Sequence, residues 1–219
     1  ESNTVAQHLY QRFGFENGFQ DENRAHPTYG FWKFFENVED YPLAIYTDDN
    51  GWAAYANLRA YALTGEKDYL RRGLATVEGF LETQTPNGLR MRRMEGPDLL
   101  KNGRAWYARN GKPSDNPHYV STGDRAVLEA YAVTRQSKYL DSARRAIDVM
   151  AAAYPDFETT GTITRATQVA KFLSSPVLMY HHTREPKYLE LARRVIRDLR
   201  ARQHATGAIP EWGAHTREY

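Results

Sequence analysis

The chain has 219 residues, 41% of them hydrophobic, which is enough for one sizeable domain and excludes wholesale disorder. Its net charge of +2 argues against a general nucleic-acid binder, whose affinity would rest on neutralising phosphates. The absence of Cys excludes a disulfide framework and a thiolate metal site, and no run approaches the ~18 apolar residues that span a bilayer.

The first predicted elements are a long loop and a helical hairpin. Residues 14–47 are rich in Gly, Asn and aromatics and predict an irregular stretch of a length that is more often functional than not. Residues 51–63 read as a helix with Arg59 as its only charge, and a helix apolar on all sides must be buried on all sides. Residues 67–83 read as an amphipathic helix, because their apolar residues recur at intervals of three and four.

A second irregular stretch, residues 85–122, precedes two further hairpins. Their inner and outer helices are predicted at 124–134 with 137–154, and at 165–182 with 186–203. The third inner helix carries one charge between residues 169 and 179, Lys171, and Pro176 should kink it.

A repeated sequence joins the two helices of each hairpin. A Tyr, a Thr three residues later and a Tyr-Leu pair after eight residues recur from Tyr61, Tyr131 and Tyr180. The repeat reads as helix, tight turn, helix, with Gly65 as a left-handed C-cap. Buried inner helices wrapped by amphipathic outer ones predict an all-α fold. We expect residues 1–219 to form one domain, an incomplete α/α toroid or a solenoid of about three hairpins.

In such a stack, every connection from an outer to an inner helix lies on one face, at the amino-terminal ends of the inner helices. The long loops and nearly all the notable polar residues fall on that face. The positive ends of the helices also meet there and favour anionic groups. We therefore expect one site assembled from residues that are far apart in the sequence.

The carboxylates on this face are the candidate catalytic groups: Asp48, Asp49, Asp124 and Glu211. The three aspartates stand where helix N-caps stand, and plain capping is the commoner role for such residues. A cap needs only one of two adjacent aspartates, however. Two carboxylates in one pocket can act as an acid and a base when their environments separate their pKa values, and glycoside cleavage requires such a pair.

Other residues on this face are candidates for binding a substrate. Arg92 and Arg93 belong to a basic loop that is either simply solvated or recognises uronate or sulfate groups, for which Arg offers bidentate geometry. Trp106 and Trp212 fall in loops and could stack on sugar rings. The remaining candidates are His118, Tyr119 and Arg165.

The run Asp-Asp-Asn-Gly-Trp at 48–52, followed by Leu-Thr-Gly-Glu-Lys-Asp-Tyr-Leu at 63–70, resembles the six-hairpin glycosidases. It is similar to bacterial endo-α-mannanases, whose adjacent Asp-Asp pair is catalytic, and this resemblance would implicate Asp48 and Asp49. It is also similar to unsaturated glucuronyl hydrolases, which place one catalytic Asp before each of two inner helices, and this would implicate Asp49 and Asp124. The family closes a ring with six hairpins, so we expect the chain to continue into a longer protein or to self-associate.

Three functions remain open at this stage. The leading one is a glycoside hydrolase that cleaves an oligo- or polysaccharide, with acidic glycans among the candidates, by means of paired carboxylates. A polysaccharide lyase or sugar epimerase would instead use His118, Tyr119, Arg165 or Tyr180 to abstract a proton. A non-catalytic repeat module would bind glycan or protein on its concave face. The histidines lack ligand spacing and there is no phosphate loop, so no metal, cofactor, nucleic acid or membrane partner is expected.

Overall fold

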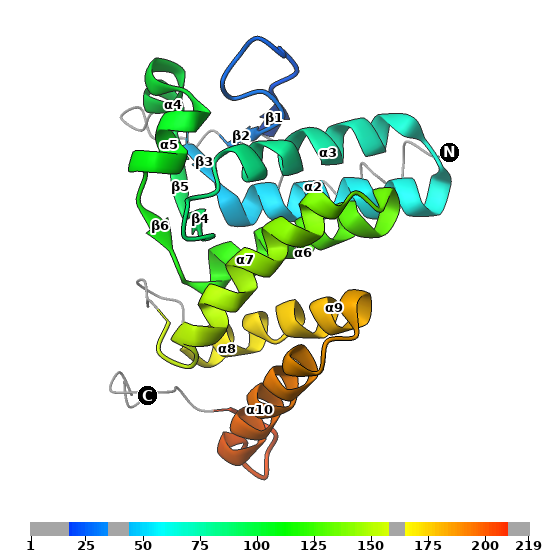
Figure 1. Cartoon of the computed structure of the whole chain (residues 1–219), viewed down its shortest axis with the longest axis vertical. Coiled ribbons are helices and arrows are strands. Elements are labelled where there is room, and N and C mark those ends of the chain that lie inside the picture. Colours follow the sequence, from blue (N-terminus) through cyan, green and yellow to red (C-terminus); the bar gives the residue numbers. More distant parts are fainter. Residues whose placement is uncertain (1–17, 35–43, 158–164, 210–219) are drawn as a thin grey trace.

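Three helical hairpins form the body of the computed structural model, which describes residues 18–34, 44–157 and 165–209. The first hairpin consists of α2 (Thr47–Thr64) and α3 (Lys67–Glu82), and the second of α6 (Pro117–Thr134) and α7 (Ser137–Ala153). The third has α8 (Arg165–Phe172) and α9 (Ser174–Thr183) as its inner helix and α10 (Pro186–Arg202) as its outer one. The hairpins follow one another along the molecule in chain order (Figure 1), which confirms the all-α fold and the three predicted hairpins.

Residues of the repeat close each hairpin in the same way. The Thr hydroxyl at the end of each inner helix donates to the carbonyl four residues back, at 2.8, 2.6 and 2.8 Å for Thr64, Thr134 and Thr183, and accepts the N–H two residues on. The residue between them is left-handed, as predicted for Gly65, with φ of 74° there and 59° at Arg135 and Arg184. These bonds satisfy polar groups that a helix end leaves unpaired, which explains why Thr recurs.

The expectation that each inner helix is more buried than its outer partner holds only in part. Eleven residues are buried in α6 and six in its outer partner α7. By contrast, α2 has eight buried residues and the slightly shorter α3 has seven. The difference arises because the segment before α2 covers α3. Phe31 packs on Phe80 with ring centroids 5.9 Å apart, and Gln20 donates to the carbonyl of Arg72 at 2.8 Å.

The two stretches predicted to be irregular contain short ordered elements, so that expectation is corrected. The first holds β1 (Gly18–Gln20), β2 (Trp32–Phe34) and β3 (Ala44–Tyr46). The second holds β4 (Arg90–Met91), β5 (Arg93–Glu95), α4 (Gly96–Asn102), α5 (Arg104–Asn110) and β6 (Pro113–Ser114). The strands pair antiparallel in the order β1-β2-β3-β5 and, separately, β4-β6. Strands of two or three residues are too short to show a periodic pattern.

Two inner helices begin earlier than predicted, and the third is broken where a kink was expected. Helix α6 starts at Pro117, seven residues before Asp124, because the Asn116 side chain caps it by accepting the N–H of His118 at 2.9 Å. In the third inner helix, Pro176 has no N–H for the carbonyl of Phe172, and the helix is interrupted at Leu173. Across the described part of the chain, no helix has the length and apolarity to cross a membrane.

Candidate active site at the amino-terminal ends of the inner helices

Asp48 and Asp49 lie in the first turn of α2, whose N-cap position is occupied by Tyr46. Neither aspartate therefore stands at the cap, and the capping interpretation is corrected for both. Both still lie beside the positive end of the helix. The adjacent Asn50 is fully buried and fixes this turn. Its amide donates to the carbonyls of Trp32 and Tyr46 at 3.0 and 2.9 Å and accepts the N–H of Trp32 at 2.6 Å.

Asp48 contacts the next inner helix through His118. Its Oδ2 lies 2.9 Å from His118 Nε2, with 14% of the Asp48 side chain and 24% of the His118 side chain exposed. Asp48 Oδ1 is buried and has no hydrogen-bond partner among the described residues. Gly51 makes this approach of α2 to α6 possible, because a Cβ there would lie 2.8 Å from the backbone of Thr122.

The third inner helix reaches the same point through Lys171, whose Nζ contacts His118 Nδ1. Asp48, His118 and Lys171 thus form a chain of contacts across α2, α6 and α8. Burial lowers the pKa of Lys171, and Asp48 acts in the opposite direction by favouring its charged form. Lys171 was noted in the sequence only as the single charge of its helix. That isolated charge was the available signal, because a lysine in a buried helix needs a partner.

Arginine–aromatic pairs surround this group. The Arg92 guanidinium lies 5.0 Å from the ring of Tyr119, and that ring packs edge-on against His118. Arg93 lies 5.4 Å from the ring of Tyr46, which directly precedes α2. Four of the predicted binding residues, Arg92, Arg93, His118 and Tyr119, therefore come together near Asp48.

A third arginine–aromatic group lies further along the same inner helices. The Arg125 guanidinium lies 5.0 Å from the ring of Trp52 and 5.7 Å from that of Tyr55. Arg125 is also near enough to Lys171 to lower its pKa by like-charge repulsion. The face therefore combines cations, aromatic rings and carboxylates, the groups that a sugar-binding surface uses.

Asp124 lies elsewhere. Because α6 begins at Pro117, Asp124 is two turns inside the helix and fully buried, and the capping interpretation is corrected for it too. Its Oδ1 accepts from Arg90 at 3.0 Å (Nε) and lies 2.8 Å from Arg90 Nη2. Burial raises the pKa of Asp124 to about 6, and the nearby Arg90 charge opposes that rise. Since Arg90 also donates to Phe80 and Ser142, this pair joins α6 to the outer helices.

Trp106 is described, and it is not part of the group around Asp48. Trp106 lies on α5, where its ring packs edge-on against Tyr107. Arg165 is the first residue of α8, but its side chain is outside the described part of the chain, as are Glu211 and Trp212. Within the described residues, no group of three His, Asp or Glu side chains could hold a metal ion.

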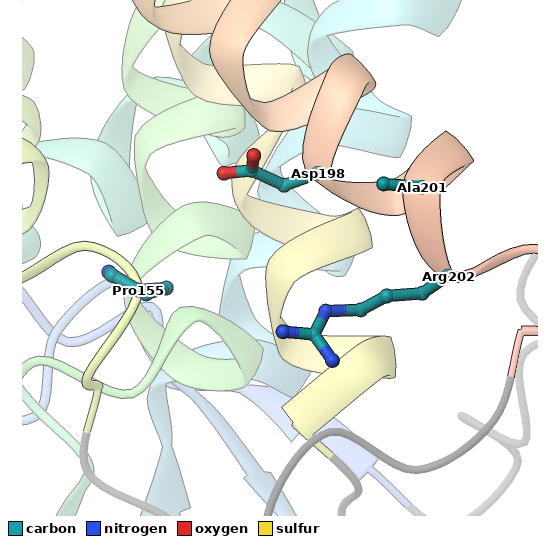
Figure 2. Close-up of a pocket in the computed structure, with 4 residues that line it drawn as sticks. All are labelled: Pro155, Asp198, Ala201 and Arg202. Carbon is teal, nitrogen blue, oxygen red and sulfur yellow. The ribbon is translucent and has the colours of Figure 1, made fainter.

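A surface hollow lies apart from these residues in the outer layer. It is lined by Pro155, just after α7, and by Asp198, Ala201 and Arg202 of α10 (Figure 2). None of the site candidates lines it. The candidate site is the group around Asp48, where side chains from three inner helices contact one another.

Comparison of the sequence with protein-family models and with curated proteins gives no match. Solved structures do match. An α-mannanase of glycoside hydrolase family 76 from Bacteroides thetaiotaomicron has a TM-score of 0.67 and 17% identity, over 95% of this chain and 54% of its own. A protein from Listeria innocua has a TM-score of 0.64 and 15% identity, over 93% and 55%.

A third match is an α-1,6-mannanase of Salegentibacter, with a TM-score of 0.57 and 15% identity over 77% of this chain and 51% of its own. That structure is an inactive variant, with two consecutive aspartates replaced by alanine, in complex with α-1,6-mannotetrose. The chain spans about half the length of these solved structures. At these identities the likeness establishes the fold alone. The chain thus has the α/α-hairpin fold of these solved structures over about half of their length.

Proposed function

We propose that the chain belongs to a carbohydrate-active enzyme, a glycoside hydrolase in which Asp48 and Asp49 form the catalytic carboxylate pair. One observation carries the proposal. Two consecutive aspartates occupy the first turn of an inner helix, on the face where the inner helices meet, and Asp48 Oδ1 is buried without a hydrogen-bond partner among the described residues. In glycoside cleavage a carboxylate acts either as a nucleophile on the anomeric carbon or as a base toward the attacking water.

The solved structures support this proposal and suggest the first substrate to test. The Salegentibacter α-1,6-mannanase was inactivated by replacing two consecutive aspartates, and Asp48 and Asp49 are consecutive here. We therefore choose α-linked manno-oligosaccharides as the first panel, with uronate-containing oligosaccharides as the second. Asp124 is left out of the proposed pair, because its carboxylate is fully buried against Arg90.

The experiment replaces each aspartate by Asn, which keeps the shape of the side chain but removes its charge and its titratable proton. We expect Asp48→Asn and Asp49→Asn each to lower turnover by about 10² to 10⁴. The melting temperature should hardly move. Asp141→Asn, on the exposed surface of α7, is the matched control and should keep full activity.

Three results would count against the proposal. Full activity in both Asp48→Asn and Asp49→Asn would remove the carboxylate assignment. A product with a new carbon–carbon double bond, detected by its ultraviolet absorbance, would indicate elimination and so favour the lyase alternative. Glycan binding without any cleavage would leave the non-catalytic module as the function.

A further inference from the structure

Lys171 is an unusual residue in the inner layer. It is partly buried on α8, and among the described residues no carboxylate lies within ion-pair distance of it. Withdrawing a lysine from water is unfavourable unless a partner compensates the lost hydration. The partner that Lys171 does have is the Nδ1 atom of His118.

This contact restricts the protonation of His118. A charged lysine has three hydrogen-bond donors and no acceptor, so the Nδ1 that it contacts must accept. A neutral imidazole has one donor and one acceptor, which puts its proton on Nε2. Nε2 is the atom 2.9 Å from Asp48 Oδ2, and a carboxylate is a suitable acceptor for that proton. The three residues therefore form one directed chain of contacts from Lys171 to Asp48, with the proton of His118 on the side of the carboxylate.

The direction of this chain matters for Asp48. Its Oδ2 is the oxygen that the Nε2–H of His118 faces at 2.9 Å, while Oδ1 is buried without a hydrogen-bond partner among the described residues. If Lys171 were absent, the Nδ1–H form of His118 would become accessible, and its Nε2 lone pair would then face the carboxylate. That arrangement is repulsive and would turn the imidazole or the carboxylate away.

We propose that Lys171 is a positioning residue for Asp48 and acts through His118, by holding the imidazole in the Nε2–H form. The role of Lys171 in catalysis rests on the proposed function, but its effect on the protonation of His118 does not. The charged groups facing Lys171 in the described residues are Asp48 from α2 and Arg125 from α6. His118, also from α6, is the titratable group that it contacts.

The protonation form of His118 is tested without any substrate. Nitrogen-15 spectra of the histidine rings distinguish the Nε2–H form, the Nδ1–H form and the doubly protonated form. The His118 signal is identified by its loss in His118→Gln. We expect the unmodified protein to show the Nε2–H form of His118, and a dominant Nδ1–H form there would overturn the proposal whether or not any variant folds.

Variants of Lys171 then test whether this residue is what holds His118 in the Nε2–H form. Lys171→Met should give His118 a mixture of the two neutral forms, whereas Lys171→Arg keeps a donor at this position and should restore the Nε2–H form. Lys138→Met, which removes a surface lysine bound to Glu78, is the matched control and should leave the spectrum unchanged. A Lys171→Met spectrum identical to that of the unmodified protein would also overturn the proposal.

Kinetics on an accepted substrate complete the test. Removal of a residue that orients a functional group typically lowers activity by about 10- to 100-fold. We expect Lys171→Met to lower kcat by that factor with little change in KM, and Lys171→Arg to recover part of the loss. An altered His118 spectrum with unchanged kcat would show that the hydrogen-bond chain exists but Asp48 is not catalytic. The proposed function would then fail separately from the positioning role.

Discussion

Asp48 and Asp124 are the same residue type, but they lie in different environments that give them different roles. Asp48 is 14% exposed and contacts His118, whereas Asp124 is fully buried and bound to a guanidinium that is only 2% exposed. Each aspartate keeps one oxygen without a partner among the described residues. A buried ion pair seldom adds net stability, but breaking one leaves an uncompensated charge in the interior. We therefore interpret Arg90 and Asp124 as a structural unit that holds α6 against the outer layer.

Replacing Asp124 tests this interpretation. Asp124→Asn leaves the Arg90 guanidinium buried without a counter-charge, so we expect the free energy of unfolding to fall by about 3–5 kcal/mol. Urea unfolding measures it, with Asp141→Asn on the surface of α7 as the control that should stay within about 0.5 kcal/mol. Unchanged stability together with lost turnover would instead make Asp124 catalytic, as the resemblance to unsaturated glucuronyl hydrolases implies.

The close approach of two inner helices places the proposed site. The nearest neighbours of a Cβ on Gly51 would be backbone atoms of Thr122 and Gly123, at 2.8 and 2.9 Å. Backbone atoms cannot rotate out of the way, so α2 and α6 can lie this close only because residue 51 has no side chain. The same approach brings Asp48 to His118.

We predict that Gly51→Ala is destabilising although alanine is the better helix former. The gain in helix propensity is about 1 kcal/mol, and forced separation of packed helices costs about 1–3 kcal/mol. The Asp48–His118 contact should lengthen, so turnover should fall as well. Chemical denaturation and the glycosidase assay measure the two effects. A more stable and fully active variant would show that the helices are not held at this distance.

The hairpin turns allow a comparison inside one molecule. Position 65 is Gly with φ of 74°, while the equivalent Arg135 and Arg184 adopt φ of 59° with their guanidinium groups 5.7 and 5.6 Å from the rings of Tyr131 and Tyr180. A left-handed residue with a Cβ costs about 1–2 kcal/mol, and a cation over an aromatic ring returns about 0.5–1 kcal/mol. The two arginines thus offset strain that Gly65 does not have.

From this we predict an order of stabilities at position 65. Gly65→Ala should lower the free energy of unfolding by about 1 kcal/mol, and Gly65→Arg by less, because the arginine can lie over Tyr61 as its counterparts do over their tyrosines. No atom would lie within 4 Å of an added Cβ, so steric overlap does not complicate the comparison. Equal losses in the two variants would mean that the ring contact contributes nothing.

At the scale of the whole molecule, the hairpins and their order could be predicted because they depend on local patterns. Nearly charge-free helices alternate with amphipathic ones, and the Tyr and Thr of the repeat mark each turn. The sheet could not be predicted, since its strands have at most three residues. The earlier start of α6 could have been read from Asn116 and Pro117, a cap followed by a first-turn proline.

The contacts that define the site could not be predicted from the sequence. His118 and Lys171 are 53 positions apart, and Arg90 and Asp124 are 34 apart. The isolated charge of Lys171 signals that a partner is needed but not which one, and nothing around Arg90 distinguishes its ion pair from two solvated charges. Only the packing of the inner helices decides that Asp124 points into the core while Asp48 meets His118.

The third hairpin presents an edge with two exposed apolar residues, and this carries the last prediction. In the described part of the chain, Val177 of α9 and Ile196 of α10 are 46% and 37% exposed there. Apolar side chains that lie together on a surface can form an interface with another copy of the chain. We therefore expect the 219-residue chain to associate in solution through this edge.

Light scattering should then give a mass above 25.2 kDa for the chain alone. The double variant Val177→Lys with Ile196→Lys should be monomeric, because burying two ammonium groups opposes association, and its circular dichroism should be unchanged. Leu100→Lys, at a residue 44% exposed on α4, is the matched control and should associate like the parent. A parent chain that is already monomeric would show that this edge needs no cover, whereas loss of association in the control would place the interface at α4 instead.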